Sequence, residues 1–458
     1  MKGGYDGTMG RREEIIERSC GLDYETYERE GLRFDYEHLM RTGYSIDRVQ
    51  EIGHDINVGE TPLVELTNIT KLVRSMAPKG KGARLFVKDE ATNPSKSYKD
   101  RRALLNVYHA EREGYDGVIA ATSGNYGAAV ASQAAKRGLD CIVVQEVFDS
   151  KGRGQPEILE KTRACEAYGA EVIQLSVGPE LFYKHLELLE ETGFFNASLY
   201  TPWAVAGVEP LGWEIATEVR ERTGREPDAV FVTHAGGGNL TGTARGLRAA
   251  DCDATVVGVS VNLEGLSMAS DTDFNRKSFT TGHTGFGIPF LVEPDRSDVP
   301  RSAARALRYI DRYCTVEQGE VFYVTEMLAQ LEGIERGPAG NTSLAAAIPV
   351  ATRMDEDGIV VVQETEYTGA GKHPTSQLTF ARELGVEITR GPPDENIPGE
   401  VIAIPEHPSQ LRAATRDLDA IRTSYLRRKA ADAGEDDIDF LVTETGADEA
   451  FVREMLSS

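Results

Sequence analysis

Short apolar runs alternate with amphipathic helical stretches through most of this chain, and this alternation limits the possible folds more than any other feature. Strands that alternate with helices predict parallel sheets with helices packed on their faces. The runs are apolar at nearly every position, which is typical of strands buried on both sides. We therefore predict an α/β fold. The predicted strands are residues 84–87, 118–121, 141–145, 171–175, 229–233, 256–261 and 359–363.

The length of 458 residues exceeds that of one usual domain, about 100–200 residues, so we expect two packed domains with extensions. A polar, helix-compatible segment precedes the first strands, and we interpret it as an extension that wraps a neighbour. Three prolines between residues 396 and 408 predict a linker before a charged helical tail. The predicted units are an N-terminal extension (1–57), a large domain (58–99 and 206–395), a smaller α/β domain (100–205), and the linker with its tail (396–458).

Composition excludes several classes of protein. The chain has 50 basic and 74 acidic residues, a formal net charge of −24, which argues against nucleic-acid binding. No run of about 18 apolar residues is present, so no membrane span is expected. The first residues lack the apolar core of a signal peptide, and the five cysteines are scattered. We therefore expect a cytoplasmic protein with reduced thiols and without a metal site.

Lys99 lies within the segment Asn-Pro-Ser-Lys-Ser-Tyr-Lys-Asp-Arg-Arg at positions 93–102. Asn-Pro-Ser is typical of a turn, and Ser97 can cap the helix that follows. Lys99 is then in the first helical turn, where the positive helix end, Arg101 and Arg102 disfavour a protonated amine. A lysine with a lowered pKa is suited to imine formation, so Lys99 is the candidate catalytic residue. An ordinary surface lysine is the alternative on this segment alone.

A second turn, formed by Ser123, Gly124, Asn125 and Tyr126, lies between a predicted strand and a predicted helix. Glycine and asparagine tolerate positive φ, so the turn can be tight. Its side-chain donors and backbone N–H groups gather at a helix N-terminus, where a carboxylate binds. We expect a substrate-binding turn here. An ordinary strand-to-helix turn is the alternative.

Three consecutive glycines, Gly236, Gly237 and Gly238, follow a predicted strand and precede Asn239, Leu240 and a helix. The backbone amides of such a turn converge on an anion, and the helix dipole adds a favourable potential. The spacing matches neither the dinucleotide nor the P-loop motif. We therefore predict a phosphate cup of another kind.

In this order, these segments resemble the fold-type II family of pyridoxal-phosphate (PLP) enzymes, which includes tryptophan synthase β, threonine synthase and cysteine synthase. Residues 58–63 (VGETPL) also resemble the motif before that family's first strands. The resemblance implies two open, mostly parallel sheets flanked by helices, with PLP bound in the large domain as a Schiff base on Lys99. It also implies that Asn125 lies next to the cofactor's 3′-oxygen and that residues 236–240 hold its phosphate.

The group that meets the pyridine nitrogen is expected just after the predicted strand 359–363. The resemblance favours Thr368, in a Thr-Gly pair like that of threonine synthases, and Thr365 or Glu364 are the alternatives. An acidic partner would keep the nitrogen protonated, whereas a hydroxyl would leave it largely neutral. The residues alone leave this choice open.

A closer resemblance covers nearly the whole chain and is to the β subunits of 2-amino-4-oxopentanoate thiolases. This family converts 2-amino-4-oxopentanoate and coenzyme A (CoA) into alanine and acetyl-CoA in ornithine breakdown. The resemblance implies a small α subunit as partner, and a homodimer of this chain is expected from the wider family. Another fold-type II lyase or β-replacement enzyme, or a non-catalytic subunit, is the alternative. The segments that carry the resemblance are 174–183, 277–287, 335–345 and 363–372.

The implied reaction suggests further site residues. Lys99 is expected to act as general base at the substrate Cα. The oxyanion that develops at C4 needs hydrogen-bond donors, and His283 is the substrate-binding candidate for this role. Lys96 stands where such motifs usually carry a small residue, and we expect it to point to solvent. Further candidates are Thr280, Thr281 and His234 as donors, and Glu335, Asn341 and Thr342 in the cofactor pocket.

Overall fold

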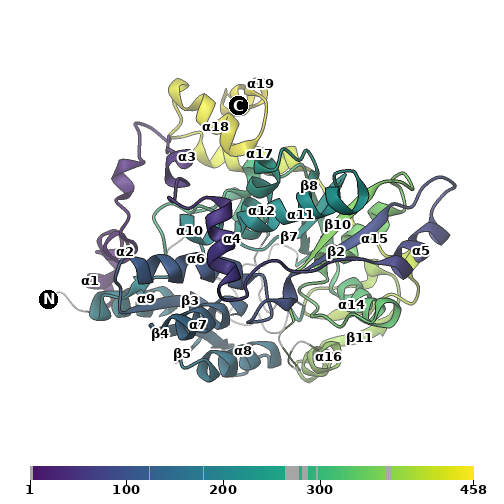
Figure 1. Ribbon diagram of the computed structural model, residues 1–458, viewed down its shortest axis with the longest axis horizontal. Coiled ribbons are helices and arrows are strands. Elements are labelled where there is room, and N and C mark those ends of the chain that lie inside the picture. The colour runs from purple at the N-terminus through teal and green to yellow at the C-terminus, as the bar shows by residue number, and fades with distance from the viewer. Residues whose placement is uncertain are drawn as a thin grey trace.

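The computed structural model describes residues 4–122, 124–178, 180–263, 278–280, 287–295, 298–367, 369, 371 and 373–457. Its strands form two open sheets and one separate pair (Figure 1). The large sheet has the order β1-β2-β10-β7-β8-β9-β13, and the small sheet has the order β5-β4-β3-β6. The strands are β1 Leu63–Glu65, β2 Arg84–Asp89, β3 Gly117–Thr122, β4 Asp140–Phe148, β5 Glu171–Ser176, β6 Phe195–Asn196, β7 Ala229–Thr233, β8 Thr255–Val261, β9 Arg312–Val316, β10 Ile359–Glu364, β11 Glu387–Arg390, β12 Val401–Ile404 and β13 Ala414–Arg416.

The predicted α/β class is confirmed, and all seven sequence-predicted strands are present. Every pair within the small sheet is parallel. In the large sheet only the two edge strands, β1 and β13, pair antiparallel. The central strand β10 is buried at all six positions, which explains its continuous apolar sequence. The strands that sequence patterning missed include short edge strands, which have few apolar residues to reveal them.

Helices cover the faces of both sheets (Figure 1). In the small domain α7 and α9 pack on β3 and β4, whereas α15 packs on β7, β8 and β10 of the large sheet. Among the described residues, no helix is long and apolar enough to cross a membrane. The helices are α1 Tyr5–Met9, α2 Arg12–Cys20, α3 Tyr36–Leu39, α4 Ile46–His54, α5 Thr67–Met76, α6 Lys99–Arg112, α7 Asn125–Arg137, α8 Pro156–Ala167, α9 Glu180–Thr192, α10 Pro202–Ala206, α11 Glu209–Thr223, α12 Gly238–Ala249, α13 Ile288–Val292, α14 Gln318–Glu332, α15 Thr342–Ala351, α16 Pro374–Glu383, α17 Leu418–Lys429, α18 Ile438–Thr445 and α19 Glu449–Ser457.

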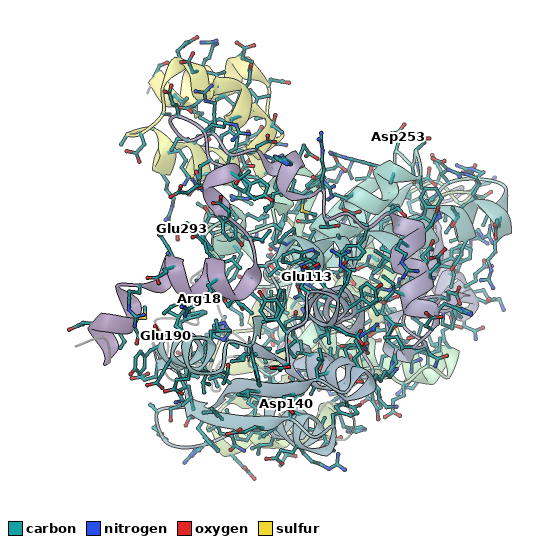
Figure 2. The ribbon with its side chains drawn as sticks, turned by 60° about the vertical axis from the view of Figure 1, so that its left-hand side comes forward. Arg18, Glu113, Asp140, Glu190, Asp253 and Glu293 are labelled. Atoms are coloured by element: carbon teal, nitrogen blue, oxygen red, sulfur yellow. The ribbon has the colours of Figure 1, made fainter. Side chains whose placement is uncertain are left out.

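The N-terminal extension packs on the body of its own chain. Ile15 and Ile16 of α2 are fully buried in the main core, and Arg11 forms an ion pair with Glu190 of α9. Figure 2 shows Glu190 beneath the purple N-terminal helices. Tyr36 is also buried, and its hydroxyl donates to the carbonyl oxygen of Ala303 at 3.0 Å. The wrapping interpretation therefore needs no second chain for these contacts.

The predicted linker at 396–408 is wrong as a description of that segment. Strand β12 lies within it and pairs in parallel with β11, and β13, a few residues later, extends the large sheet. Its prolines flank β12 and leave the strand itself uninterrupted, so the prolines mark the ends of a short strand instead of a free connection.

The helical tail is anchored by buried charges. Glu444 of α18 is 3% exposed and accepts hydrogen bonds from Arg305 Nη1 at 3.2 Å and from Arg308 Nε at 2.5 Å. The tail also meets the N-terminal extension, because Asp437 Oδ1 accepts a hydrogen bond from the backbone N–H of Leu32 at 3.0 Å. Figure 1 shows the tail, in yellow, beside α3 at the top of the molecule.

Candidate active site

A cavity of about 230 Å³ lies where three strand ends come together. Strand β3 ends at Thr122, β7 ends at Thr233, and the segment after β10 contributes Thr365; all three residues line the cavity. Ligands of open parallel sheets bind outside the carboxyl ends of the strands, so this is the expected place for a site.

Lys99 is the first residue of α6, and its half-buried side chain lines this cavity. Its backbone N–H donates to Ser97 Oγ at 3.3 Å. The predicted cap at Ser97 is wrong, because the N-cap position of α6 is Tyr98, whose side chain makes no capping hydrogen bond. Its Nζ lies 2.5 Å from the hydroxyl of Tyr98. Burial lowers the pKa of Lys99, and the nearby Arg102 lowers it further, whereas Tyr98 acts in the opposite direction. A lysine with a lowered pKa is neutral more of the time, which both a nucleophile and a base require.

Lys96 is exposed and does not line the cavity. Its backbone φ is +65°, in the left-handed region that favours glycine. The expectation that Lys96 points to solvent agrees with its exposure.

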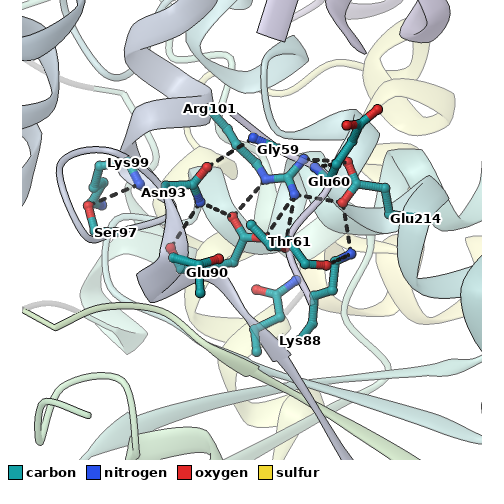
Figure 3. Close-up of polar contacts among 12 residues, drawn as sticks. Gly59, Glu60, Thr61, Lys88, Glu90, Asn93, Ser97, Lys99, Arg101 and Glu214 are labelled. Atoms are coloured by element: carbon teal, nitrogen blue, oxygen red, sulfur yellow. Dashed lines mark hydrogen bonds and ion pairs between the residues drawn. The ribbon is translucent and has the colours of Figure 1, made fainter. Parts of the chain in front are cut away.

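The start of α6 is fixed by a buried cluster of charges (Figure 3). Arg101 is 2% exposed and lies between two carboxylates: its Nε donates to Glu90 at 2.7 Å and its Nη1 donates to Glu214 at 2.8 Å. Lys88 is fully buried and forms an ion pair with Glu214 at 2.9 Å. Burial alone would raise the pKa of Glu214, but Arg101 and Lys88 outweigh it and lower this pKa to about 2.

The segment before β1 closes the same cluster. Thr61 Oγ1 donates to Glu90 at 2.5 Å, and the backbone N–H of Gly59 donates to Asn93 Oδ1 at 3.0 Å. The VGETPL motif and the lysine motif are thus two halves of one polar structure. Because Arg101 is held on both sides, the helix turn that carries Lys99 has a fixed position.

The triple-glycine turn approaches other residues too closely for side chains. Gly237 has φ +89°, and Gly238 is the first residue of α12. A β-carbon at Gly236 would lie 2.3 Å from the Tyr200 hydroxyl, and one at Gly238 would lie 2.2 Å from Arg102 Nη2. Gly236 lines the cavity, and Gly237, Gly238, Asn239 and Leu240 follow it directly.

Asn239 ties this turn to the large sheet. Its Nδ2 donates to Gln363 Oε1 at 2.8 Å, and Gln363 Nε2 in turn donates to Thr243 Oγ1 at 2.7 Å. The side chain of Asn239 is therefore engaged with β10, and only the backbone of this turn is left to face a ligand.

The start of α7 also lines the cavity, through its N-cap Gly124 and its first two residues, Asn125 and Tyr126. Asn125 Oδ1 is buried without a hydrogen-bond partner among the described residues. The hydroxyl of Tyr126 accepts a hydrogen bond from Asn106 Nδ2 at 2.7 Å, so its ring is held in place. Ser123 lies outside the described residues, as do His283, Thr281 and Thr368.

The residues predicted to meet the pyridine nitrogen differ in their position relative to the cavity. Thr365 lines the cavity together with Glu366, whereas Glu364 does not. The Glu364 carboxylate is fully buried against Gly340, and burial raises the pKa of Glu364 well above its usual value. Thr365 is therefore better placed than Glu364 to meet a ligand.

Of the remaining sequence candidates, His234 and Thr342 line the cavity. A ring nitrogen of His234 lies 3.1 Å from the Tyr313 hydroxyl, and Thr342 Oγ1 is buried without a partner among the described residues. Thr280 and Asn341 are fully buried but do not line the cavity, and Glu335 is exposed.

Sequence reasoning missed several cavity residues. Arg102 was assigned only to the background charge around Lys99, although it is one helical turn away on the same face. Glu157 and Lys161 of α8 form a buried ion pair at the cavity wall, and Asp298 reaches it from a loop. The four-residue spacing of Glu157 and Lys161 is common on helices, so nothing in the sequence marked them.

These residues fit a pyridoxal-phosphate molecule. The glycine turn leaves no room for β-carbons at Gly236 and Gly238. Arg102 presents two buried nitrogens without hydrogen-bond partners among the described residues, and Asn125 has an unsatisfied amide oxygen. Lys99 lies in the same cavity with a lowered pKa. A phosphate, a polar ring and an aldehyde thus each have a matching group.

Comparison with known proteins defines the class. Residues 55–365 match the family model described as pyridoxal-phosphate dependent enzyme, and the chain belongs to this family. A solved structure of O-ureido-L-serine synthase is similar, with a TM-score of 0.53 and 25% identity over 69% of this chain and 91% of that chain.

Two relatives are similar over nearly the full length. A 2-amino-4-ketopentanoate thiolase beta subunit from Acetoanaerobium sticklandii is 61% identical, covering 98% of this chain and 97% of that protein. A second protein of the same name, from an unknown prokaryotic organism, is 59% identical over 99% of this chain and 97% of its own length.

Proposed function

We propose that this chain is the cofactor-binding β subunit of a 2-amino-4-oxopentanoate thiolase. The compound 2-amino-4-oxopentanoate is the same as the 2-amino-4-ketopentanoate in the names of the relatives. The reaction transfers the acetyl group of the amino ketone to CoA and leaves alanine, and it belongs to ornithine degradation. The observation that carries this proposal is the 61% identity over 98% of the chain, which includes the segments around the cavity.

The reaction breaks the bond between C3 and C4. The CoA sulfur bonds to C4 and the thiol loses its proton. After the C3–C4 bond breaks, C3 gains a proton from the solvent or a side chain, so the atoms balance without an oxidant. When bound, PLP supplies the electron sink for the negative charge left on C3. Lys99 holds the cofactor covalently and moves a proton at the substrate Cα, a role that its lowered pKa supports.

The other proposed roles follow the cavity walls. The N–H groups of residues 236–240 hold the phosphate, and the turn at Ser123, Gly124, Asn125 and Tyr126 holds the substrate carboxylate at the positive end of α7. Asn125 also contacts the 3′-oxygen. Thr368 or Thr365 meets the pyridine nitrogen. His283 is proposed as donor to the C4 oxyanion, with His234 as the second candidate.

We also propose the division into a large cofactor domain (58–99 and 206–395) and a smaller domain (100–205). The two separate sheets support it, because all strands of the small sheet lie between residues 117 and 196. The cavity then lies between domains, a common place for small-molecule sites.

The partners are part of the proposal. The relatives are named as beta subunits, which supports a small α subunit as partner. CoA carries several phosphates and this chain has a net charge of −24, so we propose that the α subunit supplies part of the CoA site. A homodimer of the β chain is proposed from the wider family.

A coupled assay tests the function. The chain is co-expressed with candidate small partners, purified as a complex, and supplied with the amino ketone, with CoA, or with both. Acetyl-CoA and alanine are expected in equal amounts only when both are present. Release of ammonia without CoA, or exchange of a β-substituent, would instead assign the chain to lyases or β-replacement enzymes.

A further inference from the structure

Arg102 has an unusual environment. The side chain is 1% exposed, and its Nε and Nη2 have no hydrogen-bond partner among the described residues. The neighbouring Arg101, equally buried, is matched by Glu90 and Glu214. The polar neighbour of Arg102 is the Tyr98 side chain, which is not a carboxylate. A buried guanidinium without a carboxylate partner is strongly destabilising, so the environment of Arg102 is incomplete as it stands.

The guanidinium of Arg102 is directed at the glycine turn. Its Nη2 is 2.2 Å and its Cζ 2.5 Å from the position of a β-carbon on Gly238, and Arg102 lines the cavity together with Lys99 and Gly236. Gly238 begins the 12-residue helix α12, whose positive end points to the same place. Two positive groups this close together are stabilised by an anion that lies beside both of them.

The carboxylates of the cavity do not supply that anion. Glu157 is paired with Lys161, Glu366 accepts from the backbone N–H of Gly340, and Asp298 accepts from Ser198. Among the residues that the structure describes, Arg102 has no ion pair with any of them. The Tyr98 hydroxyl is engaged with Lys99 Nζ at 2.5 Å. The missing anion therefore belongs to a ligand.

We propose that Arg102 binds the phosphate group of PLP and completes the glycine cup with a charged side chain. The backbone N–H groups supply direction, and the guanidinium supplies the charge, as a charge-assisted hydrogen bond. Tyr200 packs beside both groups: the Arg102 Cζ lies 6.0 Å from the centre of its ring. This inference rests on the cofactor family and not on the thiolase reaction, so either can fail alone.

The test compares two ligands that differ only in the phosphate. Apoprotein is titrated with PLP and, separately, with pyridoxal, and binding is followed by visible absorbance. Arg102→Met is expected to weaken PLP binding by about 10- to 100-fold and to leave pyridoxal binding within about twofold. Arg102→Lys should be intermediate, with a shifted ³¹P resonance of bound PLP. Arg112→Gln, on the exposed end of the same helix, is the matched control.

Stability of the apoprotein gives an independent readout. In the apoprotein the guanidinium of Arg102 lacks an anionic partner. The Arg102→Met apoprotein should therefore unfold at the same or a higher denaturant concentration than the wild-type apoprotein, because an uncompensated buried charge is removed. Failure of this variant to fold, unchanged PLP affinity, or equal loss of PLP and pyridoxal binding would each overturn the proposal. A raised KM for the amino ketone with unchanged PLP affinity would assign Arg102 to the substrate carboxylate instead.

Discussion

At the scale of single residues, Lys96 and Lys99 lie three positions apart and differ in exposure, backbone conformation and surroundings. Lys96 is exposed in a left-handed backbone conformation, whereas Lys99 lines the cavity beside Tyr98 and Arg102. The same motif thus contains one lysine that is exposed to solvent and one that lines the candidate active site. Their difference in burial makes them a matched pair for experiment.

Lys99→Ala should abolish both the visible absorbance of bound cofactor and turnover, because the amine that we propose to bind PLP covalently is lost. The circular dichroism spectrum should remain that of the wild type, since Lys99 makes no ion pair in the described structure. Lys96→Ala should keep the absorbance band and at least half of the activity. A Lys99→Ala protein that retains the band would remove this lysine from the site.

Glu214 gives a prediction about pH. Its pKa is lowered from 4.5 to about 2, so its stabilising effect is present above pH 4.5 and is lost as pH falls towards 2. Glu214→Gln should reduce the free energy of unfolding at neutral pH by about 3–5 kcal/mol, because Lys88 and Arg101 lose a buried partner. The difference from wild type should shrink as denaturant unfolding is repeated at lower pH. An equal difference at all pH values would contradict the assigned pKa.

At the scale of elements, the site depends on strand ends that lead into helices. Gly238→Ala is expected to weaken PLP binding by at least about tenfold, since the new methyl group would collide with Arg102. Gly434→Ala is the control, because Gly434 has an ordinary φ of −106° and its β-carbon would meet only Asp437 at 3.6 Å. PLP titration of both apoproteins checks this. Normal affinity in Gly238→Ala would show that the cup can relax.

The sequence predicts these central elements well and the contacts between them poorly. Most of the seven predicted strands follow from continuous apolar runs, whereas the edge strand β5 is partly exposed and has polar residues. Lys99, Gly236 and Asn125 follow from turns that precede helices. Arg102 and the ion pair of Glu157 and Lys161 on α8 were not predicted, because their position at the cavity depends on which helix faces pack together. The periodicity of the sequence does not encode that packing. The prediction of a linker at 396–408 was wrong because prolines occur at the ends of strands as well as in linkers.

At the scale of the whole molecule, the tail is joined to the body by buried charges and by apolar side chains such as Tyr425 and Leu441, which belong to the main core. Glu444→Ala should lower stability by about 3–5 kcal/mol, because Arg305 and Arg308 lose a buried carboxylate. PLP affinity should remain unchanged, since none of these residues lines the cavity. Thermal unfolding checks the loss of stability, and PLP titration of the same preparation checks the affinity. A loss of PLP affinity would mean that the tail supports the site.

The hydrogen bond between Leu32 and Asp437 has a consequence for biosynthesis. Its two residues are 405 positions apart, so the partner of Leu32 leaves the ribosome only when the chain is almost finished. At about 5–20 residues per second, residues around 32 wait tens of seconds for this contact. The contact between the N-terminal extension and the tail therefore forms only after the strands of both sheets have been synthesised.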